Sequence, residues 1–177
     1  MCRLRRYSPL LLAALLLAGC SSSSATTTTT APSSSTTVPT TIGTIPAADR
    51  SPAGTAGSEP TVVVPAGTPP TELQVADLIT GTGPAAKAGD SVTVQYVLAT
   101  YSSGKTIQSS WTSQPFTFTL GEGQVIPGWD KGVAGMQVGG RRELIIPPSL
   151  GYGSQSPGAG ISANDTLVFV VDLVKIN

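Results

Sequence analysis

Apolar and polar residues alternate in two stretches of the C-terminal half of the chain. In residues 92–98 every second residue is apolar, and in residues 116–120 two phenylalanines and a leucine enclose two threonines. A period of two is typical of a strand with one buried face. Both stretches are therefore predicted to be strands that cover a core.

Three further stretches have the composition of strands. Leu73–Ile79 is mostly apolar and ends at a glycine-rich turn, and Arg142–Ile146 is followed by Pro147, which cannot continue a strand ladder. Thr166–Ile176 is long and largely apolar on both faces. Because strands buried on both faces read this way, it is predicted to lie in the centre of the sheet.

Residues 125–136 show a helical period instead. Trp129, Val133 and Met136 are spaced as i, i+4 and i+7, which places them on one face of a helix. Pro127 is suited to the first helical position, and glycines 139 and 140 indicate a turn before the next strand. A helix this short needs packing to be stable, so we expect it to lie against the sheet.

These elements define an α+β domain over residues 71–177, with an antiparallel sheet packed on one short helix. Residues 147–164 are glycine-rich and irregular, as is usual for loops that carry function. Residues 20–70 consist mostly of Ser, Thr, Pro, Ala and Gly. They lack the apolar surface that would offset the entropy of ordering, so they are predicted to form a disordered linker.

The N-terminus has the pattern of a secretory signal over residues 1–19. Three arginines precede the apolar run Leu10–Ala18, which is too short to span a bilayer. The run ends in Leu-Ala-Gly-Cys20, which resembles the lipobox of bacterial lipoproteins. That resemblance implies cleavage before Cys20, acyl chains on Cys20 and an extracytoplasmic, membrane-anchored location. The alternative is an ordinary signal with an unmodified cysteine.

Composition excludes several kinds of chemistry. The sequence contains no histidine, and both cysteines lie at the N-terminus. Ser-His-Asp and Cys-His catalysis are therefore absent, as are most zinc sites, and no metal or cofactor is implied. The 10 basic and 10 acidic residues give no basic patch of the kind that nucleic acid requires.

A set of short motifs, in order and at matching spacing, resembles the FKBP-type peptidyl-prolyl isomerase domain. They are Gln95-Tyr96, Ser109-Ser110, Pro115–Phe118, Leu120-Gly121, Val125–Trp129, Gly132-Val133, Met136, Val138-Gly139, Gly151–Gly153 and Thr166–Phe169. The resemblance implies a strongly twisted five-stranded sheet half-wrapped around the helix.

The resemblance also implies a site for a prolyl ring. Its floor would be Trp129, with Tyr152 and the Ile126 backbone N–H as donors to a substrate carbonyl. The remaining implied residues are walls of the pocket: Tyr96, Phe116, Val125, Ile126, Ile161 and Phe169. The alternative is that these are ordinary core residues, and for Phe118 and Val133 we favour that interpretation.

Two departures from the family pattern lie at the rim of the implied pocket. Ile107-Gln108 stands where the family usually has Phe-Asp, and residues 111–114 lack an arginine often found there. Ile107 keeps an apolar wall without a flat face, and Gln108 brings no charge. We therefore expect weakened catalysis and weakened macrolide binding.

Rotation about an X–Pro bond has a barrier of about 20 kcal/mol and needs no acid, nucleophile or metal. A charge-poor aromatic cavity suits that reaction. The first hypothesis is a monomeric, lipid-anchored isomerase that acts on proline-containing segments of exported proteins. The second is a binding module or chaperone with little turnover, and the third is a structural envelope lipoprotein.

Overall fold

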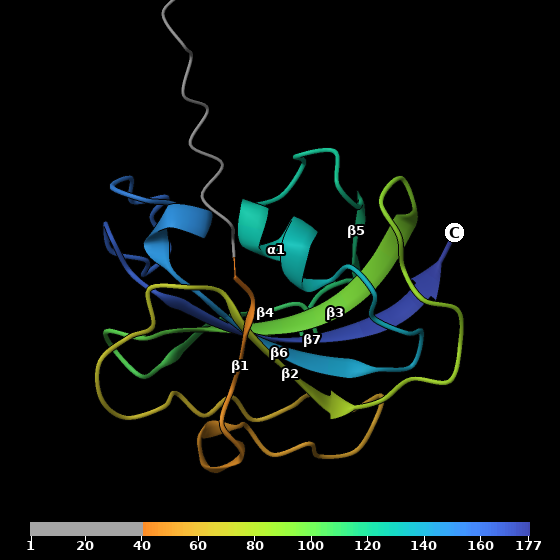
Figure 1. Cartoon of the computed structure of the whole chain (residues 1–177), viewed down its shortest axis with the longest axis horizontal. Coiled ribbons are helices and arrows are strands. Elements are labelled where there is room, and N and C mark those ends of the chain that lie inside the picture. The colour runs from red at the N-terminus through yellow and green to blue at the C-terminus, as the bar shows by residue number, and fades with distance from the viewer. Residues whose placement is uncertain (1–40) are drawn as a thin grey trace, which may run out of the picture. The chain divides into compact units, whose positions relative to one another are not determined.

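The computed structural model describes residues 41–177. The predicted signal peptide, Cys20 and the first half of the predicted linker lie outside the described residues. Within residues 41–177, one short α-helix packs against one face of a strongly curved sheet (Figure 1). No helix in this part of the chain is long and apolar enough to cross a membrane.

The sheet is mixed and has seven strands, so the predicted α+β class is confirmed and the predicted count of five is wrong. Its spatial order is β1-β2-β6-β7-β3-β4, and β5 also pairs with β3. The strands are β1 (Gly43–Thr44), β2 (Gln74–Ile79), β3 (Ser91–Thr100), β4 (Thr106–Ser109), β5 (Phe116–Thr119), β6 (Arg141–Ile146) and β7 (Leu167–Ile176).

The two additional strands are β1 and β4, and each has a physical reason for escaping prediction. β1 has two residues and pairs in parallel with β2, whereas the other pairings are antiparallel. β4 has four residues, of which only Ile107 is apolar. Neither strand is long enough to show a period.

β7 lies between β6 and β3, as the sequence predicts. Its first seven residues are buried, and it pairs with β6 from Arg141 to Ile146 and with β3 from Val92 to Thr100, with a shift of register between Thr93 and Val94. Because both faces of β7 are covered, alternation is absent from its sequence. This central strand separates two apolar clusters, one on each face of the sheet.

The helix α1 (Pro127–Gly132) lies over the concave face of the sheet (Figure 1). Pro127 occupies its first turn as predicted, but the helix ends at Gly132, so Met136 reaches the core from the following turn. Two glycines permit a close approach to β6. A Cβ on Gly128 would lie 2.8 Å from Ile146 Cδ1, and one on Gly132 would lie 2.7 Å from Leu144 Cδ2.

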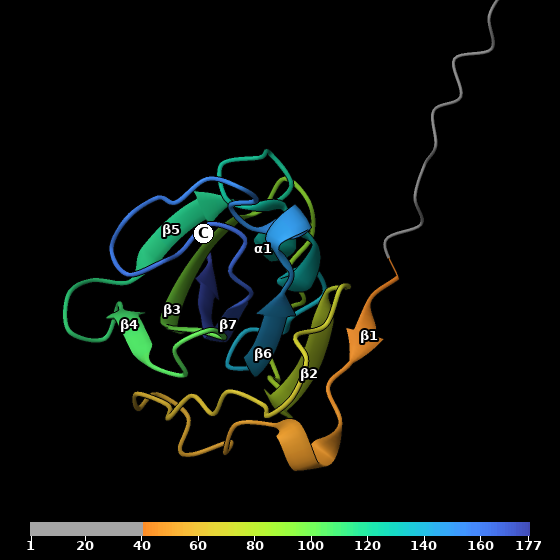
Figure 2. The ribbon, with the colours of Figure 1, turned by 90° about the vertical axis from the view of Figure 1, so that its left-hand side faces the viewer.

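The opposite face is covered by residues 43–64, which we name the N-terminal strap. Figure 2 shows it running from β1 beneath the sheet toward β4. Ile45 is fully buried in a cluster with Ile145 and Val168, and Val62 and Val64 pack on that cluster. The prediction that the linker stays disordered as far as residue 70 is therefore wrong from residue 43 onward.

Polar contacts also hold the strap. Ser51 donates to the Glu143 carboxylate from its backbone N–H at 2.9 Å and from its hydroxyl at 2.6 Å. Arg141 pairs with Asp172 at 2.5 Å and donates to the carbonyls of Ala53 and Ser58. The two buried side chains of β6, Arg141 and Glu143, thus find partners in the strap, which is how a segment poor in apolar residues becomes ordered.

Candidate active site

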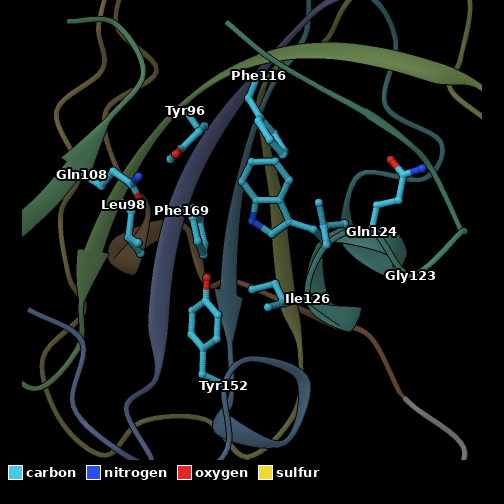
Figure 3. A pocket seen from close by; sticks show the side chains of 11 residues that line it. Tyr96, Leu98, Gln108, Phe116, Gly123, Gln124, Ile126, Tyr152 and Phe169 are labelled. Atoms are coloured by element: carbon cyan, nitrogen blue, oxygen red, sulfur yellow. The ribbon is translucent and has the colours of Figure 1, made fainter. Parts of the chain in front are cut away.

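A cavity of about 480 Å³ opens between α1, the concave face of the sheet and the loop that follows β6 (Figure 3). Its volume falls within the roughly 300–1,000 Å³ of typical ligand sites. The lining residues are Tyr96, Leu98, Gln108, Phe116, Gly123, Gln124, Val125, Ile126, Trp129, Tyr152 and Phe169.

The floor of the cavity is the indole of Trp129, which α1 holds only 4% exposed. Three other rings of the lining surround it, and each meets it nearly edge to face. The ring centroids lie 5.3 Å away for Tyr96, 5.2 Å for Phe169 and 6.0 Å for Phe116. Edge-to-face contacts place the positive edge of one ring against the negative face of another, which is favourable. They leave a rigid apolar surface facing the opening.

The indole N–H of Trp129 is buried and has no hydrogen-bond partner among residues 41–177. A buried donor without a partner is uncommon in folded proteins. Because this nitrogen is covered by other atoms, Trp129 lines the cavity through the rest of its ring.

Tyr152 lies on the other side of the opening, in the loop after the 3₁₀ turn η2 (Pro148–Leu150). Its side chain is 38% exposed, and its hydroxyl points from the loop toward Phe169 in Figure 3. Burial, and then the neighbouring Tyr152, raise the pKa of the Tyr96 hydroxyl. Tyr96 therefore stays protonated at neutral pH and can act as a hydrogen-bond donor.

Two amides complete the polar part of the rim. Gln124 accepts a hydrogen bond from the Thr119 N–H at 3.0 Å through its side-chain oxygen, which leaves its NH₂ group available. Gln108, from β4, is exposed and its side chain makes no hydrogen bond with the described residues. The lining thus contains neutral polar groups and no carboxylate or ammonium group.

The structure brings together eight of the ten pocket residues implied by the sequence. Ile107 and Ile161 do not line the cavity and contribute instead to the hydrophobic core. Ile161 is buried in the turn before β7, and a Cβ on Gly160 would lie 3.3 Å from Ile107 Cγ2. The loop therefore closes over Ile107, and both side chains support the wall from behind.

Three lining residues were missed at the level of sequence. Leu98 follows Tyr96 by two positions on β3, so the strand period carried enough information to find it. Gly123 and Gln124 belong to the loop before α1, where no periodicity identifies the residues that face inward. Phe118 and Val133, assigned to the core, are buried there.

Such a cavity has little capacity for acid–base chemistry, because its only titratable side chains are two tyrosines. No cluster of potential metal ligands occurs within residues 41–177 either. What the cavity offers is an aromatic floor, apolar walls and neutral donors at the rim. These properties suit the binding of a small apolar ring within a peptide, with hydrogen bonds to the carbonyls beside it.

Comparison with known proteins identifies the family. Residues 83–174 match the family of FKBP-type peptidyl-prolyl cis-trans isomerases. An FK506-binding protein of Streptomyces anulatus is 50% identical over 120 residues, which cover 67% of this chain and 97% of that protein. FK506-binding protein 4 of Aspergillus fumigatus is 46% identical over 104 residues, which cover 59% of this chain and 21% of that protein.

Solved structures agree with this result. FkpA from Escherichia coli is 38% identical, with a TM-score of 0.55, and the match covers 60% of this chain and 49% of that one. AtFKBP13 is 34% identical, with a TM-score of 0.54, and the match covers 62% of this chain and 96% of that one. The chain belongs to the FKBP-type peptidyl-prolyl cis-trans isomerases, as the sequence motifs predicted.

Proposed function

We propose that the cavity over Trp129 catalyses the cis–trans isomerisation of X–Pro bonds in exported proteins on the outer side of the cell membrane. The observation that carries the proposal is the aromatic lining, which contains no ionised side chain. The reaction transfers no proton and breaks no covalent bond. Its barrier of about 20 kcal/mol reflects the amide resonance that is lost in the twisted state.

The lining residues have two roles: they bind the prolyl ring, and they stabilise the twisted amide. The prolyl ring packs on the indole of Trp129, between Phe169, Phe116 and the side chains of Val125 and Ile126. The twisted amide has a less polar carbonyl than the planar one, so a dry cavity favours it over the ground state. Each ~1.4 kcal/mol of such preference raises the rate about tenfold.

Two donors hold the peptide on either side of the ring. The Tyr152 hydroxyl donates from the loop, and the Ile126 N–H, which has no partner among the described residues, donates from the N-terminus of α1. Both hold a carbonyl of the substrate while the bond rotates. Their positions on separate elements allow the ring to enter between them.

The location rests on the sequence. The arginine-rich start, the apolar run and the Leu-Ala-Gly-Cys20 motif support a lipid anchor on Cys20, with residues 21–42 as the tether of a monomeric domain. Mass spectrometry of the mature N-terminus tests this point. We expect a peptide that begins at Cys20 and carries acyl chains, and a Cys20→Ser variant should leave the membrane fraction.

The activity is tested by proline-limited refolding and by a peptide isomerisation assay with residues 41–177. We expect acceleration that Trp129→Ala reduces at least tenfold, because the variant loses the floor of the cavity. Circular dichroism shows whether that variant is folded. A folded protein that accelerates neither reaction would contradict the proposal.

A second candidate function is a proline-segment binding module or chaperone with weak turnover. The observation that favours it is the rim, where Gln108 is neutral and Phe116 is 40% exposed, so that extended segments can rest on it. Binding of a prolyl peptide without any rate increase would select this function. Because several relatives are named for FK506, we also propose weak binding of this macrolide, measurable as inhibition.

A further inference from the structure

The cavity has space for more than a prolyl ring. At about 480 Å³ it accommodates the ring over Trp129 together with part of the neighbouring residue. Its floor is apolar, but four side chains at its rim are polar: Tyr96, Gln108, Gln124 and Tyr152. Residues that flank a bound proline would therefore lie against these neutral polar groups.

We propose that Gln108 makes this site accept segments in which an acidic residue precedes the proline. The proposal rests on the isomerase function proposed above. Gln108 is exposed at the rim, and neither its amide oxygen nor its NH₂ group is engaged by the described residues. Its two N–H donors are free to hydrogen-bond a substrate carboxylate.

The other polar groups of the lining act in the same direction. The Gln124 oxygen is occupied by the Thr119 N–H, so the NH₂ group is the part of this amide that remains able to donate. The hydroxyls of both tyrosines are donors, and that of Tyr96 is held protonated by burial. Each polar side chain of the lining thus retains a group that can donate to a carboxylate.

The acidic side chains near Gln108 and the opening lie outside the lining, and one of them, Glu59, accepts a hydrogen bond from the hydroxyl of Ser109, the residue after Gln108. Asp130 is directed to the backbone N–H groups of Gly121 and Gly123, at 2.9 and 3.1 Å, and Glu122 does not line the cavity. An acidic substrate residue therefore faces no carboxylate within the lining. A carboxylate at position 108 would repel an acidic substrate residue, whereas the neutral amide does not.

The test uses residues 41–177 and a series of peptides that differ only in the residue before proline: Leu, Gln, Glu or Lys. For the natural sequence we expect the kcat/KM with Glu to lie within about tenfold of the kcat/KM with Leu. In Gln108→Asp we expect the Glu-to-Leu ratio to fall about tenfold, which is the effect of like charges a few ångströms apart in a partly solvated site. Added salt should restore part of the loss.

Gln137→Asp is the matched control, because Gln137 is exposed and outside the cavity and bonds only through its backbone. This variant should keep the ratio of the natural sequence. Turnover with a Glu-to-Leu ratio that Gln108→Asp leaves unchanged would refute this proposal alone. The same holds if the natural sequence already rejects Glu strongly. Absence of turnover with every peptide would refute the proposed function as well.

Discussion

Tyr152 is the most accessible aromatic donor of the cavity, since it projects from a loop whose glycines leave it without close packing. Tyr152→Phe keeps the ring and removes the hydroxyl. Because one hydrogen bond contributes about 0.5–1.5 kcal/mol, we expect kcat/KM to fall roughly 2- to 12-fold with little change in thermal stability. The peptide isomerisation assay measures this effect.

Tyr101→Phe provides the control for this substitution. Tyr101 packs on the cluster beneath the strap, on the other face of the sheet, so the same atom is removed far from the cavity. Its kcat/KM should match that of the unaltered protein. Equal losses in both variants, or none in Tyr152→Phe, would show that the hydroxyl takes no part in turnover.

Glu143 is fully buried, and its burial has a consequence for stability. Desolvation raises the pKa of this carboxyl from its ordinary value of 4.5, although the hydrogen bonds from Ser51 and the charge of Arg50 oppose the shift. The folded protein therefore holds this proton more tightly than the unfolded chain. The stabilisation is complete below about pH 4.5 and is lost as the pH rises through the folded pKa.

Glu143→Gln removes this titration. We expect the melting temperature of the unaltered protein, relative to that of the variant, to decrease as the pH is raised from 4 to 7. Calorimetry at several pH values measures the difference. Glu72→Gln changes an exposed carboxylate in the same way and should show no comparable trend. A melting temperature of the parent that instead increases relative to that of the Glu143 variant as the pH is raised would contradict the sign of the shift.

At the scale of elements, the strap is a segment that folds although its sequence has no helical or strand periodicity. Ile45 is fully buried, yet it stands in a stretch of threonines, glycine and prolines. We expect Ile45→Ala to destabilise the domain by about 2–5 kcal/mol, as for other buried isoleucines. Chemical denaturation measures the loss. A loss of this size would come from a residue outside residues 83–174, the range that matches the family.

Ile42→Ala is the natural comparison, because Ile42 lies three positions earlier and is 46% exposed. It should change stability by only a few tenths of a kcal/mol. If Ile45→Ala were as mild as Ile42→Ala, the strap would not be part of the cooperative fold.

The strap also shows why the sequence predicted some elements and not others. β3 and β7 have ten residues each and carry long runs of apolar or alternating positions, so local pattern identified them. The strap buries Ile45, packs Val62 and Val64 on the same cluster, and otherwise depends on the hydrogen bonds between Ser51 and Glu143, 92 residues away. The composition of a segment does not reveal a hydrogen bond between polar residues so far apart in the sequence.

In the candidate site, too, some residues could be predicted from the sequence and others could not. Its rings were found through motifs whose order matches a family, and the structure gathers them around Trp129. Ile161 and Ile107 were assigned to the wall because of their positions in the sequence. Whether a side chain forms the surface of a cavity or the layer behind it depends on loop closure, here of Gly160 over Ile107, which no local pattern encodes.

For the whole molecule, the absence of histidine has a direct kinetic consequence. The cavity lining has only two titratable side chains, both tyrosines, and the pKa of Tyr96 is raised further from neutrality. If catalysis is preferential binding of a twisted amide, no proton transfer limits it. We therefore expect kcat/KM for an uncharged prolyl peptide to vary less than about threefold between pH 5.5 and 8.5, where general acid–base catalysis would give a bell-shaped profile.

The measurement needs an assay that is itself independent of pH, such as exchange between the cis and trans resonances of a peptide in nuclear magnetic resonance. A Glu-Pro peptide in the same series also stays ionised over this range and should give a parallel, flat profile. A sigmoidal profile with a midpoint near pH 6–7 would mean that an ionising group outside the lining controls turnover. The mechanism would then have to include residues beyond the aromatic cavity, and Trp129 would serve binding alone.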